Sequence, residues 1–175
     1  FEKIKEIVSK SYLISKPANV INNTLYLDNS TLESQTDIRA QSIDRDLEQT
    51  HIAVGYRTVD TYNDDTYALS ILQTIMAGNM SSRLFKNLRL NHGLTYNVSI
   101  DANEYEKHGI FCILTSVDNK KVLDYTVDKT KKPGAISVIA DTISDLIKNG
   151  VTETEIVKAK GYVKGQLTLS SENAL

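Results

Sequence analysis

Two neighbouring runs of residues, 94–103 and 110–117, constrain the fold more than any other part of the sequence. In the first run apolar and polar residues alternate without a break, and its apolar side consists of Leu94, Tyr96, Val98, Ile100 and Ala102. Strict alternation of this kind is typical of an antiparallel sheet with one covered face. The second run is apolar on both faces, which predicts a central strand. A turn at residues 107–109 predicts that the two runs pair as a hairpin.

Helical patterns surround this hairpin, and a further half-buried strand is predicted at residues 51–58. The first predicted helix is capped by Asp64 or Asp65 and runs through Met76. The second, 82–92, is capped by Ser81 or Ser82 and closed by Gly93. The third, 135–148, is ended by Gly150, and the capping box Thr152-x-x-Glu155 opens the last helix. Weaker patterns suggest helices at 1–8 and 120–130 and short strands at 20–27 and 38–40. Together they predict an α+β fold, in which an antiparallel-rich (mixed) sheet carries helices packed on one face.

No repeat, linker or low-complexity segment divides the sequence, so residues 1–175 are expected to form a single domain. A helical pattern is already present at Phe1 without a cap, and another continues to Leu175 without a stop signal. The chain is therefore expected to be truncated at both ends.

Charge and composition exclude several classes of function. A net charge of −2 gives no basic field for nucleic acid or an anionic membrane surface. The single cysteine, Cys112, excludes a disulfide framework and a thiolate zinc cluster. The three histidines never stand four residues apart, as the zinc-helix motif His-Glu-x-x-His or its inverse requires. Since no apolar run approaches the roughly 20 residues needed to span a bilayer, a soluble, intracellular protein without its own metal is expected.

Arg89 and Tyr96 are the candidate functional residues. On a helix from Ser82, Arg89 lies roughly 40° past Phe85, at the rim of the buried stripe. Tyr96 is the second inward-facing residue of the strand that follows Gly93, so a helix–glycine–strand corner should bring the two side chains to one edge. The guanidinium of an arginine and the hydroxyl of a tyrosine are hydrogen-bond donors. Two such donors at one edge can bind a carbonyl oxygen or an oxygen that becomes negatively charged during a reaction. Alternatively, Arg89 extends to solvent and Tyr96 packs in the core, with no role in chemistry.

The segments around this pair resemble a known family. They are Ala77-Gly-Asn-Met-Ser-Ser-Arg-Leu-Phe85, Leu88-Arg89 and Gly93-Leu-Thr-Tyr-Asn-Val98, flanked by Gln49-Thr-His-Ile-Ala-Val-Gly55, Val151-Thr-Glu-Thr-Glu155 and Ala159-Lys-Gly-Tyr-Val-Lys-Gly-Gln-Leu167. These segments are similar to the C-terminal, non-zinc domain of the insulinase, pitrilysin and mitochondrial processing peptidase family. The match spans most of the chain.

The resemblance implies a function in peptide hydrolysis. In that family the zinc motif lies in a preceding domain of similar fold, and the C-terminal domain contributes an Arg and a Tyr that contact the substrate. It implies that Arg89 and Tyr96 take these catalytic and substrate-binding roles here, whereas Arg83 has a structural role. It implies zinc in a partner domain, in cis or in a second chain, and a peptide or unfolded polypeptide as substrate. This fragment alone would then be inactive. The alternative is a non-catalytic structural or partner subunit of the same family.

Two stretches depart from the family's pattern. Gly78-Asn79 stands where the family often has two or three glycines, and residues 120–134 form a longer and more broken connection than usual. Neither departure touches Arg89 or Tyr96, but both leave the subgroup of the parent protein open.

Overall fold

The computed structural model describes residues 39–172, and within it the chain from Ile43 onward belongs to one compact unit. The predicted helix at 1–8, the predicted strand at 20–27 and the last three residues of the final helix lie outside the described residues. Ala40, the described end of the strand suggested at 38–40, lies in irregular, exposed chain, so that prediction is wrong there. The polar residues Gln41 and Ser42 follow it, and they give a strand no apolar side to bury. The single domain over 1–175 stays a prediction.

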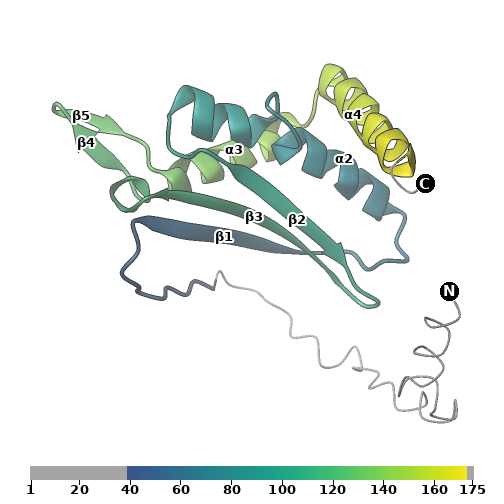
Figure 1. Ribbon diagram of the computed structural model, residues 1–175, viewed down its shortest axis with the longest axis horizontal. Helices are drawn as coiled ribbons and strands as arrows, with labels where there is room; N and C mark the ends of the chain where they lie inside the picture. Colours follow the sequence, from purple (N-terminus) through teal and green to yellow (C-terminus); the bar gives the residue numbers. More distant parts are fainter. Residues whose placement is uncertain (1–38, 173–175) are drawn as a thin grey trace, which may run out of the picture. The chain divides into compact units, whose positions relative to one another are not determined.

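The predicted central hairpin forms, but its first strand begins at Val98 and not at Leu94 (Figure 1). Strands β1 (Gln49–Thr58), β2 (Val98–Glu104) and β3 (Gly109–Asp118) make one antiparallel sheet in the order β1-β3-β2. Ile113 of β3 lies between Val54 and Ile100, its partners on the two sides. On β3, the odd-numbered residues from 109 to 117 are buried and the even-numbered ones are more exposed. One face of the sheet is therefore covered by the core and the other is not.

Helices cover that inner face, which confirms the predicted α+β fold (Figure 1). They are α2 (Asp65–Ala77), the π-helix η3 (Phe85–Asn91), α3 (Ala135–Asn149) and α4 (Glu153–Glu172). Helix α2 contacts β2 on one side and α4 on the other, and α3 contacts η3. Buried apolar side chains from the sheet and the first three of these helices form one core: Met76, Leu84, Leu88, Leu94, Val98, Ile100, Phe111, Ile113, Val117, Ala135, Val138 and Ile139.

Asparagine side chains cap two turns where aspartate or serine caps were predicted. Asn63 Oδ1 accepts a hydrogen bond from the Asp65 backbone N–H at 2.9 Å, whereas the Asp64 side chain caps nothing. Asn79 Oδ1 accepts from the Ser81 N–H at 2.8 Å, and the Ser82 hydroxyl is buried without a hydrogen-bond partner among residues 39–172. Asparagine bonds the backbone two residues ahead in both turns. The predicted capping residues therefore stand one to three positions too late.

The last two helices are bounded largely as predicted. Helix α3 ends at Gly150, whose φ of +68° suits glycine. The capping box forms at the start of α4: the Thr152 N–H donates to Glu155 Oε2 at 2.8 Å, and the Glu155 N–H donates to Thr152 Oγ1 at 3.3 Å.

A small hairpin replaces the helix predicted at 120–130. After a 3₁₀ turn, η4 (Asn119–Lys121), strand β4 (Tyr125–Val127) pairs with β5 (Thr130–Lys132). Asp128 and Lys129 between them have φ of +48° and +64°, as a two-residue type I′ turn requires. The carboxylate of Asp124 accepts hydrogen bonds from the Gly134 N–H at 3.0 Å and from the Ser137 hydroxyl at 2.6 Å. These bonds anchor the hairpin to the start of α3.

Candidate functional site

The corner between η3 and β2 positions the candidate site. Leu88 of η3 is fully buried, and Arg89, the next residue, is half-buried at the rim. The Gly93 N–H donates to Arg89 O at 3.1 Å, and the Leu94 N–H donates to Leu88 O at 2.8 Å. Gly93 has a φ of +58°, the left-handed conformation that ends many helices. The predicted glycine stop is confirmed, and it turns the chain from the helix into the sheet.

Tyr96 does not occupy the inward strand position that the alternation predicted. Its side chain is 80% exposed, and β2 begins only at Val98. Thr95 is turned inward instead, because its hydroxyl donates to Ser116 O at 2.8 Å and accepts from Thr115 Oγ1 at 2.9 Å. Since Leu94 and Thr95 both point into the core, the alternation is broken there. Tyr96 therefore lies on the surface.

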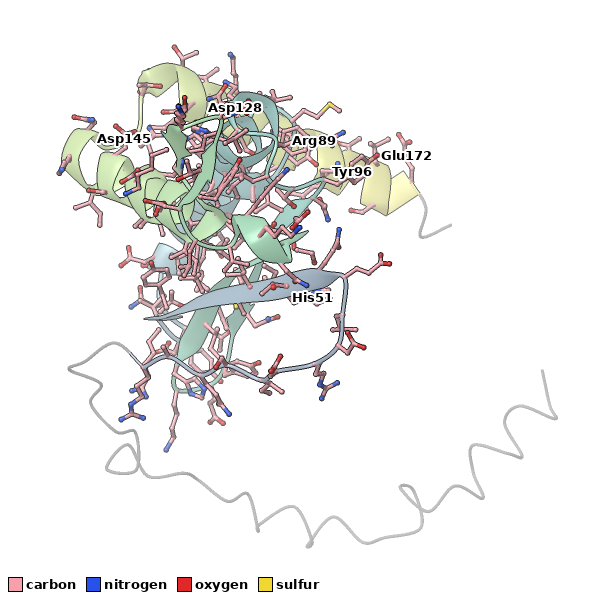
Figure 2. The ribbon with its side chains drawn as sticks, turned by 90° about the vertical axis from the view of Figure 1, so that its left-hand side faces the viewer. His51, Arg89, Tyr96, Asp128, Asp145 and Glu172 are labelled. Atoms are coloured by element: carbon pink, nitrogen blue, oxygen red, sulfur yellow. The ribbon has the colours of Figure 1, made fainter. Side chains whose placement is uncertain are left out.

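The structure nevertheless brings Arg89 and Tyr96 together (Figure 2). The guanidinium carbon of Arg89 lies 4.2 Å from the centre of the Tyr96 ring and 4.9 Å from that of Phe85. Both distances are within the roughly 6 Å range of cation–π attraction. The sequence interpretation missed Phe85 as a partner, although its i, i+4 spacing to Arg89 could have identified it. Two aromatic rings thus hold the guanidinium, one from the helix and one from the chain before β2.

The hydrogen-bonding groups of this pair are available to a ligand. Within residues 39–172, no carboxylate forms an ion pair with Arg89 and no group bonds the Tyr96 hydroxyl. A guanidinium offers five N–H donors in a fixed fork, and a phenol offers one O–H donor. Donors held in place and left unpaired can bind a carbonyl oxygen or a negatively charged oxygen that forms during a reaction.

Arg83 fixes the start of η3 to the neighbouring helices. Its side chain, 15% exposed, donates to Glu155 through Nε at 2.7 Å and Nη2 at 2.8 Å. It also donates to Gly150 O at 2.7 Å and to Asp145 at 3.2 Å. The hydrogen bonds from Arg83 are the main reason that the pKa of Glu155 falls to about 2. These contacts fit the structural role expected for Arg83 and place it outside the Arg89–Tyr96 pair.

The described part of the chain contains neither a metal-ligand group nor a membrane-spanning element. Among residues 39–172, no three His, Cys, Asp or Glu side chains lie where they could hold a metal ion together. Within the same residues, every helix is too short or too polar to cross a bilayer.

Comparisons with known proteins agree on one family. The sequence model of a family described as the peptidase M16 inactive domain matches residues 3–162. The chain is 31% identical over 136 residues to an uncharacterized zinc protease of Mycobacterium tuberculosis, and 29% identical over 131 residues to the uncharacterized zinc protease YmxG of Bacillus subtilis. These matches cover 78% and 74% of this chain but 29% of each relative. The chain thus spans less than a third of the length of these curated relatives.

Solved structures show the same fold. A crystal structure of a peptidase M16 inactive domain from Pseudomonas fluorescens is similar with a TM-score of 0.58 and 24% identity, over 68% of this chain and 27% of that chain. A protease from Helicobacter pylori is similar with a TM-score of 0.57 and 17% identity, over 72% of this chain and 28% of that chain.

Proposed function

The chain belongs to the peptidase M16 inactive-domain family, as the resemblance in its sequence predicted, and from this premise we propose that it binds the polypeptide substrate of a zinc peptidase. Arg89 and Tyr96 would donate hydrogen bonds to a backbone carbonyl next to the bond that is cleaved. The observation that carries this proposal is the contact between the two side chains: the Arg89 guanidinium lies 4.2 Å over the Tyr96 ring, and within residues 39–172 the donors of both side chains are unpaired.

The zinc of such a peptidase would lie outside this chain. The described residues offer no ligand set for it, whereas the relatives from Mycobacterium tuberculosis and Bacillus subtilis are named zinc proteases and are more than three times as long as the matched region. A zinc-bearing domain, in cis or in a partner chain, would supply the metal-bound hydroxide that attacks the peptide bond.

The pair would act on the oxygen of the attacked carbonyl. That oxygen gains negative charge as the tetrahedral intermediate forms, so donors already held in place stabilise the transition state more than the bound substrate. Phe85 and Tyr96 restrict the guanidinium on two sides, which limits the reorganisation needed when the charge appears.

A comparison of three variants in the zinc-containing protein or complex tests the proposal. Arg89→Ala should lower kcat by about 10²-fold, the usual effect of losing one oxyanion donor. Arg89→Lys keeps the charge but not the planar fork, so its kcat should lie between that of Arg89→Ala and the wild type. Lys86→Gln, an exposed position on the same helix, is the matched control and should leave kcat unchanged.

The alternative, a non-catalytic structural or partner subunit, predicts another result. If Arg89→Ala keeps the wild-type kcat while the complex assembles normally, the pair has no catalytic role. The same holds if the protein or complex that contains this chain lacks zinc and has no peptidase activity.

A further inference from the structure

Positive charge is concentrated in residues 119–134, which form η4, the β4–β5 hairpin and the connection to α3 and are called the basic hairpin below. This segment contains five lysines and two aspartates, which gives a formal charge of +3. The whole chain has a net charge of −2, so the other residues together carry −5. The lysines are Lys120, Lys121, Lys129, Lys131 and Lys132, and all except the half-buried Lys121 are exposed. The basic hairpin is thus a positive site on an acidic chain.

Most of this positive charge has no partner in the described part of the chain. Lys131 Nζ lies 3.3 Å from Asp124 Oδ2. Among residues 39–172, Lys120, Lys129 and Lys132 form no ion pair. Each of these side chains carries three N–H donors on a charged ammonium group. The three ammonium groups are therefore free to bind carboxylates of another molecule.

The base of the basic hairpin is held firmly against the rest of the fold. Gly134 approaches Leu123 so closely that a Cβ atom at position 134 would clash with the Leu123 backbone. The Ile136 N–H donates to Val122 O at 3.2 Å, and Val122 and Tyr125 pack against the core. The backbone that carries the lysines is therefore ordered before a ligand binds, which lowers the entropy cost of binding.

The basic hairpin and the Arg89–Tyr96 pair lie at the same end of the sheet. Residue 119 follows directly on the end of β3, and Thr95, next to Tyr96, donates to Ser116 O near that end of β3 at 2.8 Å. The hairpin projects from this end in Figure 1, and Figure 2, which faces it, shows Asp128 of the hairpin turn on the same side as Arg89 and Tyr96. A polypeptide bound at the pair can therefore extend toward the hairpin.

The surroundings of the lysines favour an acidic polypeptide over other polyanions. Leu123 and Val127 are 67% and 40% exposed within the same segment, and they can contact the aliphatic side chains of a polypeptide. A phosphate backbone or a layer of lipid headgroups offers no such groups. Because the rest of the chain carries −5, it also repels a polyanion large enough to extend beyond the hairpin. A short acidic segment avoids this repulsion.

We propose that the basic hairpin binds an acidic segment of the polypeptide substrate through Lys120, Lys129 and Lys132. Substrates with clustered Glu or Asp residues are then the preferred class. Since exposed charge pairs are individually weak, several carboxylates must bind together. The hairpin does not act on the carbonyl that is attacked, so it favours the bound substrate and the transition state equally. It therefore lowers KM and leaves kcat unchanged.

This assignment rests on the proposed function, because that function makes the ligand a substrate, but the binding test needs neither zinc nor turnover. Failure of the acidic peptide to bind would contradict the hairpin site alone. Wild-type kcat in Arg89→Ala would contradict the proposed function alone.

Binding of a short acidic peptide to the 175-residue chain tests the site. The probe is a capped peptide with the dipeptide Glu-Ser repeated four times, and the control peptide has Gln in place of every Glu. At about 0.05 M salt the probe should bind at least about tenfold more tightly than the control, and about 0.5 M salt should remove most of this difference. In amide NMR spectra the probe should shift residues 119–134 most. Equal binding of the two peptides, or shifts centred elsewhere, would overturn the proposal.

Two protein variants with the same change in net charge locate the site. The hairpin variant replaces the three unpaired lysines: Lys120→Gln, Lys129→Gln and Lys132→Gln. The matched control replaces three exposed lysines of α3 and α4: Lys148→Gln, Lys158→Gln and Lys164→Gln. The hairpin variant should bind the acidic probe at least about fivefold more weakly, and the control less than about twofold more weakly. Equal losses would show that net charge alone matters and would overturn the proposal.

Other anions provide a further comparison. A single strand of five nucleotides carries about the same four negative charges as the probe, and phosphatidylserine vesicles present an anionic surface. Both should bind the wild type more weakly than the acidic peptide does. Tighter binding of either, lost in the hairpin variant, would assign the hairpin to nucleic acid or membrane and overturn the proposal.

Turnover by the zinc-containing protein or complex tests the consequence for substrate choice. For a substrate peptide extended by the Glu-Ser sequence, the hairpin variant should raise KM by about fivefold and keep kcat. For the same peptide with Gln in place of Glu, both constants should stay at the wild-type values. A wild-type KM for the acidic substrate in the hairpin variant would overturn the proposal.

Discussion

The ion pair between Arg83 and Glu155 gives the most quantitative prediction for stability. It joins the start of η3 to the start of α4 through two short hydrogen bonds, of 2.7 and 2.8 Å. The perturbation is Arg83→Met, which keeps an unbranched side chain of similar length while it removes the charge and all donors. Glu155 then keeps only its bonds within the capping box to Thr152.

The pKa of Glu155 sets the size of the effect. Its fall from the usual 4.5 to about 2, caused first by Arg83, corresponds to about 3 kcal/mol at neutral pH. Solvent reaches 28% of the Glu155 side chain, and Thr152 supplies part of the shift, so we assign about 2 kcal/mol to Arg83. For a chain of this length, that loss lowers Tm by about 4–8 °C.

The same pKa fixes the pH dependence. A carboxyl whose pKa is lower in the folded state contributes stability above its unfolded pKa, and this contribution is lost as the pH falls through the folded value. The Glu155-dependent part of the stability difference between wild type and Arg83→Met should therefore be full at pH 7, begin to shrink near pH 4.5 and be nearly gone at pH 2. The part that comes from the bond to Gly150 O does not titrate and should remain.

Urea unfolding at pH 7, 5 and 3 measures this difference. Lys86→Met is the matched control, because Lys86 is exposed on η3, and it should change stability by less than about 0.5 kcal/mol. The reasoning is refuted if Arg83→Met also loses less than about 0.5 kcal/mol at pH 7, or if its loss is the same at pH 7 and pH 3.

Two further substitutions test other parts of the fold by thermal or urea unfolding. Ser82→Ala removes a buried hydroxyl that has no partner in the described part of the chain, so stability should stay equal or rise by up to about 1 kcal/mol; a clear loss would reveal a bond to that hydroxyl. Gly150→Ala should cost about 1–3 kcal/mol, because φ +68° and ψ −157° are nearly restricted to glycine. Its control, Gly161→Ala, lies inside α4 with open space around it and should stabilise by about 0.5–1 kcal/mol; equal effects at the two glycines would contradict this account.

The sequence predicted those parts of the fold in which the local pattern and the tertiary packing agree. The apolar run at residues 110–117 predicted a central strand, and β3 is that strand. The capping box at Thr152 and the glycine stop at Gly93 need only neighbouring residues to form, and both are present. The approach of Arg89 to Tyr96 was also predicted, because one helix–glycine–strand corner carries both residues.

The predictions failed where a long-range contact decides the local conformation. Thr95 points inward because Thr115 and Ser116 of β3 bond its hydroxyl, and this moves Tyr96 to the surface. The hairpin β4–β5 was also missed. Its turn residues, Asp128 and Lys129, have positive φ, but the Asn-Gly or Asp-Gly pair that usually predicts such a turn is not present there.

Turnover by a Tyr96→Phe variant tests the central claim most directly, because this substitution removes one hydroxyl and keeps the ring that contacts Arg89. In the zinc-containing protein or complex, kcat should fall by about 10²-fold or more, while Tyr62→Phe, an equally exposed tyrosine outside the pair, should leave it unchanged. A Tyr96→Phe variant that folds normally and keeps the wild-type kcat would contradict the assignment of this pair to the transition state.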